Sequence, residues 1–123
     1  MRMVGTNNSR SDPPEEIAEG IRCILDVIAE KPPQARPILL PIFPRGENVA
    51  DKRRMCNEKV NEIIRDYADV NKVIWLDFNS RFLDGNGDTK WIMPDRLHPD
   101  SDGYRIWMEA AKSRPDCWRM VAL

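Results

Sequence analysis

His98 is the only histidine of the chain, and it lies three residues after Asp95. Pro99 disfavours helical backbone at His98, so we expect an extended loop, with Asp100 or Ser101 capping a helix that follows. In a tight loop the Asp95 carboxylate can accept the Nδ1–H of His98, which leaves Nε2 as a general base. Spacing alone is equally typical of a surface pair or a helix cap, so both interpretations stay open.

A second polar pair, Asn7 and Asn8, follows Gly5 and a short apolar segment over residues 1–4. Side-chain amides at the end of a strand can donate hydrogen bonds to a developing oxyanion. The same residues are also typical of a plain turn with Asx hydrogen bonds. The pair is therefore a candidate only in combination with Asp95 and His98.

Metal and cofactor chemistry has little support in the sequence. The three cysteines, Cys23, Cys56 and Cys117, have no CxxC spacing, so we expect free thiols rather than a zinc site or disulfides. The acidic stretch 84–88 lacks the ligand ladder of an EF-hand and is interpreted as a turn. We predict no metal and no cofactor.

Apolar periodicity defines the elements that must position these residues. Helical spacing predicts helices that begin at Asp12–Pro13, run over about 50–68, and begin again near Ser101. Near-continuous apolar runs over 37–44 and 73–78 predict buried strands, with a strand end or bulge near Pro41. The positions expected to face the core of the three helices are Ile17, Ile21, Ile24, Leu25 and Ile28; Cys56, Val60, Ile63, Ile64 and Tyr67; and Tyr104, Trp107, Ala110 and Ala111.

Alternating strands and helices predict an α/β fold with a parallel sheet and helices on its faces, in a single domain over residues 1–123. Functional residues of such sheets gather at the carboxyl ends of the strands. A nucleotide-binding flavodoxin-like domain would share this pattern, but no glycine-rich phosphate loop follows a strand here.

Two segments in this order resemble a known family. Gly5-Thr6-Asn7-Asn8 resembles the third sequence block of the SGNH (GDSL-type) serine esterases, Gly-x-Asn-Asp, and 95–98 matches their fifth block, Asp-x-x-His. The flanks also resemble this family, most of all its platelet-activating-factor acetylhydrolase-like branch. The resemblance implies a three-layer α/β/α fold of flavodoxin type, of which this chain is the part from the third block onward.

The resemblance assigns roles residue by residue. Asn7 would be the oxyanion-hole side chain, His98 the general base and Asp95 the residue that orients it. Asn8 departs from the usual Asp. The nucleophile is the larger departure, because Ser9, Ser11, Ser80, Ser101 and Ser113 are not in a Gly-Asp-Ser context, so no nucleophile is assigned in this chain.

By resemblance, the function is hydrolysis of carboxylic esters with a short acyl group such as acetyl, through Ser-His-Asp chemistry. Without the serine we expect the chain alone to be inactive. The alternative is a non-catalytic fragment or pseudoenzyme that acts as an interaction module.

Charge limits the partners. With 19 basic and 20 acidic residues the formal net charge is -1, which does not favour nucleic acid or an anionic membrane surface. The apolar runs are too short for a transmembrane segment. We expect a small-molecule acyl ester with a lipid or carbohydrate alcohol as substrate. Free cysteines weakly favour the cytoplasm.

The first two strands that the resemblance implies are absent from the sequence, and the sheet edge thus exposed predicts self-association.

Overall fold

The computed structural model describes residues 11–30, 38–70, 73–90, 93–95 and 97–113. Within them the chain forms α1 (Pro14–Glu30), β1 (Ile38–Leu39), α2 (Lys52–Val70), β2 (Ile74–Trp75), the 3-10 helix η2 (Asn79–Phe82) and α3 (Ser101–Lys112). The predicted segment 1–4 and the Asn7–Asn8 pair lie outside the described residues.

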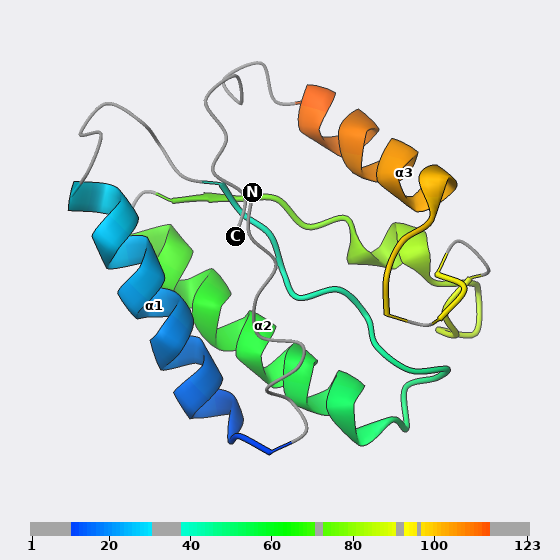
Figure 1. Ribbon diagram of the computed structural model, residues 1–123, viewed down its shortest axis with the longest axis horizontal. Coiled ribbons are helices and arrows are strands. Elements are labelled where there is room, and N and C mark those ends of the chain that lie inside the picture. Colours follow the sequence, from blue (N-terminus) through cyan, green and yellow to red (C-terminus); the bar gives the residue numbers. More distant parts are fainter. Residues whose placement is uncertain (1–10, 31–37, 71–72, 91–92, 96, 114–123) are drawn as a thin grey trace.

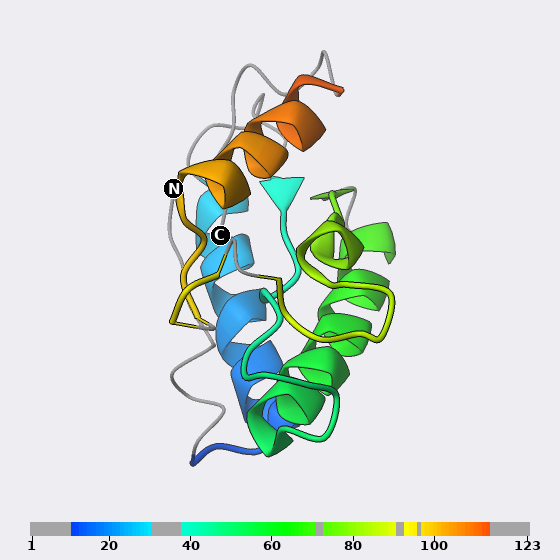
Figure 2. The ribbon, with the colours of Figure 1, turned by 90° about the vertical axis from the view of Figure 1, so that its right-hand side faces the viewer.

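The two strands form a parallel sheet. Ile38 pairs with Ile74 and Leu39 with Trp75, and the N–H of Leu76 donates to the carbonyl of Leu39. α1 and α2 lie side by side on one face of these strands, and α3 lies on the other (Figure 1). The perpendicular view shows the same three layers, with the strands between the helices (Figure 2). The predicted three-layer α/β arrangement is confirmed.

Alternation along the strands divides the core in two. Successive side chains of a strand point to opposite faces, so Ile38 and Leu40 pack toward α3, and Leu39 packs toward α1 and α2. The α3 side contains Phe43, Phe78, Phe82 and Trp107, with ring centroids 5.1–6.2 Å apart. The other side contains Ile17, Ile21, Leu25, Val60 and Ile64. Together these clusters fix both helical layers onto the strands.

Several boundaries differ from prediction. β1 and β2 are shorter than the apolar runs that contain them. The end of β1 at Leu39 agrees with the strand end predicted near Pro41, which has no N–H to donate. α1 begins one residue late, at Pro14. α2 begins at Lys52, because the Asp51 carboxylate accepts the backbone N–H groups of Arg53 and Arg54 and so caps the helix.

The predicted helix faces are largely confirmed, with two exceptions. Ile63 and Tyr104 are 37% and 42% exposed, although Tyr104 stacks on Trp107. The sequence reasoning missed two polar residues on the inner face of α2: Arg54 and Asn57 are each only 1% exposed. Within the described residues no helix is both long and apolar enough to cross a bilayer.

Candidate active site

Asp95 and His98 come together in the loop that leads into α3. The Nδ1 atom of His98 lies 2.7 Å from Oδ2 of Asp95. The other carboxylate oxygen, Oδ1, accepts the backbone N–H groups of Leu97 at 3.0 Å and His98 at 2.7 Å. The predicted contact is therefore present, and the carboxylate shapes the loop as well as holding the ring.

The two ends of this loop are anchored. Met93 is buried in the core, and its N–H donates to the carbonyl of Lys90. Asp100 caps α3 by accepting the N–H groups of Asp102 and Gly103, as the sequence predicted for this position. Pro99 between them is buried. His98 thus projects from a short segment that is fixed on both sides.

Electrostatics sets the tautomer of His98. The side-chain hydrogen bond from His98, and after it the backbone N–H of His98, lower the pKa of Asp95 to about 2. The carboxylate is therefore ionised at neutral pH and can only accept, so Nδ1 carries the proton and Nε2 of a neutral ring carries the lone pair. This is the arrangement that a general base requires.

The pair is open to solvent, with side chains 62% exposed for His98 and 55% for Asp95. No serine in the part of the chain that the structure describes hydrogen-bonds to His98. In those same residues no three metal-binding side chains gather closely enough to hold an ion. The described residues thus bring together an exposed histidine and a carboxylate that is hydrogen-bonded to its Nδ1.

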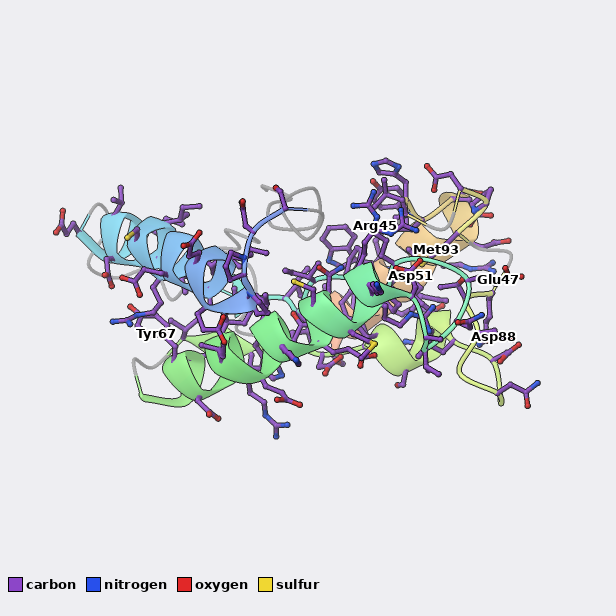
Figure 3. All side chains as sticks on the ribbon, turned by 90° about the horizontal axis from the view of Figure 1, so that it is seen from below. Arg45, Glu47, Asp51, Tyr67, Asp88 and Met93 are labelled. Carbon is purple, nitrogen blue, oxygen red and sulfur yellow. The ribbon has the colours of Figure 1, made fainter. Side chains whose placement is uncertain are left out.

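A groove beside Asp95 and Leu97 is formed by the segment after β1 and the start of α2, and Figure 3 shows Arg45, Asp51 and Met93 together at this end of the molecule. Gly46 has φ +78°, a conformation that favours glycine. A Cβ there would lie 2.1 Å from Oδ2 of Asp51, so only glycine fits. The Arg53 side chain, 2.7 Å away, holds the pKa of Asp51 at about 2.

Arg54 stabilises the segment after β1 that lines this groove. Its guanidinium donates to the carbonyls of Arg45 at 3.1 Å, Gly46 at 3.0 Å and Gly87 at 2.6 Å. It therefore joins the segment after β1 to the turn at 84–88, where Leu83 bridges to Thr89. An arginine in a helical pattern normally indicates a solvated face, so the sequence offered no signal for this role.

The comparisons with known proteins agree with this geometry. Residues 2–106 match the model of the GDSL-like lipase/acylhydrolase family. The chain belongs to this family. Platelet-activating factor acetylhydrolase IB subunit alpha1 of Pongo abelii is 34% identical over 103 residues, and subunit alpha2 of Rattus norvegicus is 36% identical over the same length. Each alignment covers 82% of this chain and 44% of the relative, so the chain spans less than half of these proteins.

Solved structures show the same fold. A GDSL-like lipase from Bacteroides thetaiotaomicron superimposes with a TM-score of 0.73 at 20% identity, covering 89% of this chain and 58% of that one. A Streptococcus protein named for platelet activating factor gives 0.68 at 21% identity. The esterase family suggested by 5–8 and 95–98 is confirmed, and ester hydrolysis of small molecules is the activity of this family.

Proposed function

We propose that Asp95 and His98 are the acid-base half of an esterase active site. The observation that carries this is the 2.7 Å contact between Nδ1 and Oδ2, which leaves Nε2 facing solvent with a lone pair. Nε2 takes the proton of a serine hydroxyl as its oxygen attacks the ester carbonyl. The alcohol leaves with that proton, and water then hydrolyses the acyl-serine with His98 again as base.

We assign the stabilisation of the oxyanion to the side-chain amide of Asn7, a residue outside the described part of the chain. The support is the sequence block Gly5-Thr6-Asn7-Asn8 and the family match over 2–106. A side-chain amide donor of this kind is typically worth about 2.7–4 kcal/mol of transition-state stabilisation.

No serine of this sequence follows a Gly-Asp pair. We therefore assign the nucleophilic serine to a segment that is not part of this sequence. That segment would belong to the same polypeptide or to a partner. The acyl group is short, such as acetyl, by similarity to relatives that are named acetylhydrolases. Lipid and carbohydrate esters are both candidate substrates.

A non-catalytic interaction module is the second candidate. The exposure of the pair favours it, because the His98 side chain is 62% exposed, whereas an active site that closes over its substrate expels water. In this case the Asp95 contact would only shape the loop before α3.

Hydrolysis of p-nitrophenyl acetate distinguishes the two. We expect no enzymatic turnover by the chain alone, and turnover when it is fused behind the Gly-Asp-Ser-containing part of a curated relative. In that fusion His98→Ala should lower kcat by roughly a million-fold, and Arg105→Gln on the exposed side of α3 should not. A folded but inactive fusion would support the interaction module. Turnover by the chain alone that His98→Ala abolishes would place the nucleophile within it.

A further inference from the structure

A second groove lies between α2 and the segment that follows β2. Its volume is about 290 Å³, at the lower end of the range for small-molecule sites. None of its residues belongs to the 95–98 loop. They are Ile42, Pro44, Arg54, Asn57, Glu58, Asn61, Glu62, Arg65, Trp75, Asp77, Asn79 and Leu83.

Two asparagines in this groove have polar atoms without a partner. Asn57 is 1% exposed, and neither its Oδ1 nor its Nδ2 makes a hydrogen bond within the described residues. Asn79 donates from Nδ2 to the carbonyl of Ile42, but its buried Oδ1 is also unpaired there. A buried polar atom without a hydrogen bond destabilises the fold, so these atoms favour a polar partner that is not part of the described residues.

A neighbouring asparagine shows that this is not a general property of the helix face. Asn61, one turn along α2, pairs both of its side-chain atoms with the backbone of Ile42, at 2.7 and 3.0 Å. Asn61 is therefore a structural residue. Asn57, in contrast, lines the same groove with a buried donor and a buried acceptor that have no partner among the described residues.

The charges around the groove limit what can occupy it. Glu58, Glu62 and Asp77 are exposed carboxylates at its rim, and Arg65 is an exposed guanidinium. The buried Arg54 adds a second positive charge. The three carboxylates disfavour a phosphate, and the two guanidinium groups offset most of their attraction for an amine, so a neutral ligand fits the groove. A hydroxyl group both donates and accepts, which matches Asn57.

We propose that this groove is a binding site for a neutral saccharide. The half-buried Trp75 lines it and offers an apolar ring surface, and the amides and carboxylates offer hydrogen-bond partners for several hydroxyl groups. The site is separate from Asp95 and His98, so the proposal stands whether or not these residues catalyse ester hydrolysis.

The test is a titration of the purified 15N-labelled chain with glucose, galactose, mannose and N-acetylglucosamine, each followed by NMR. We expect saturable shifts of the Asn57 and Asn79 side-chain amides and of the Trp75 indole with at least one sugar, with a Kd on the order of 1 mM. Asn57→Leu removes its own amide signal and should abolish the shifts of the Asn79 amide and the Trp75 indole. Asn86→Ala, at an exposed turn, is the matched control and should retain them.

A second variant guards against misfolding of the first. Asp77→Asn alters only the rim, and its side-chain oxygen can still accept the backbone N–H of Asn79 that Asp77 accepts now. It should weaken binding several-fold while the rest of the spectrum is unchanged. The proposal is overturned if none of the four sugars causes saturable shifts, which would mean that the groove holds only water. Tighter binding of putrescine or inorganic phosphate, or sugar shifts that persist in Asn57→Leu, would overturn it as well.

Discussion

The 95–98 loop and the inner face of α2 differ in how exposed their polar side chains are and in which of those side chains have hydrogen-bond partners. Asp95 and His98 are more than half exposed, yet they hydrogen-bond to each other and to the loop backbone. Arg54 and Asn57 are almost completely buried, and only Arg54 has partners among the described residues. Exposure is therefore a poor guide to whether a polar group has structural partners.

The contrast within α2 is sharper still, because Arg54 and Asn57 lie one turn apart with equal burial. Three backbone carbonyls surround the guanidinium, whereas the carboxamide makes no hydrogen bond within the described chain. Arg54 therefore stabilises the fold, whereas the unpaired carboxamide of Asn57 belongs to the proposed saccharide site. Substitutions at the two positions should then change the free energy of unfolding by different amounts and in opposite directions.

The largest effect is expected for Arg54→Met. The variant keeps most of the apolar stem but removes the guanidinium donors to the carbonyls of Arg45, Gly46 and Gly87. Losing these buried, charge-assisted hydrogen bonds should lower the free energy of unfolding by about 3–5 kcal/mol. Urea denaturation followed by circular dichroism measures this quantity. Arg53→Met is the control, since its ion pair with Asp51 is partly exposed to solvent and its loss should lower the free energy of unfolding far less.

Asn57→Leu should have a smaller effect of opposite sign. The substitution replaces two unpaired polar atoms by apolar ones of similar volume, so we expect the free energy of unfolding to stay unchanged or to rise by about 1 kcal/mol. The same urea titration checks this. A loss of more than about 2 kcal/mol would show that Asn57 has partners within the fold, and the contrast with Arg54 would disappear.

The sequence predicted features that depend on local patterns. The apolar spacing of Ile17, Ile21 and Leu25 defined α1, and the Asp95–His98 spacing with Pro99 defined the loop and its contact. These signals lie within a few residues of one another. The elements and the confirmed contact could therefore be derived without the structure.

The roles of Arg54 and Asn57 depend on distant segments and could not be derived in this way. Arg54 acts through Gly87, 33 residues along the chain, and Asn57 faces a groove completed by β2 and η2. In a helical pattern both read as solvated positions. Strand lengths were overestimated for a related reason, because burial continues through Ile42 and Phe43 after β1 has ended.

The smallest effect concerns the exposed pair. The His98 hydrogen bond is the largest of the causes that lower the pKa of Asp95 to about 2 from an ordinary value of 3.8. In His98→Ala we therefore expect this pKa to rise, but not fully, because the backbone N–H of Leu97 still donates to the carboxylate. Titration of the carboxyl carbon by 13C NMR measures both values.

The sign of the linked stability follows from the direction of the shift. A carboxyl whose pKa is lower in the folded state stabilises the fold above its unfolded pKa, and this contribution is lost as the pH falls toward 2. Solvent screens a pair that is more than half exposed, so the effect on unfolding should be slight. His98→Ala should flatten the decline in stability between pH 4 and about 2. An unchanged Asp95 pKa in that variant would mean that the backbone N–H groups alone hold the carboxylate ionised, and that the loop would keep its shape without the histidine ring.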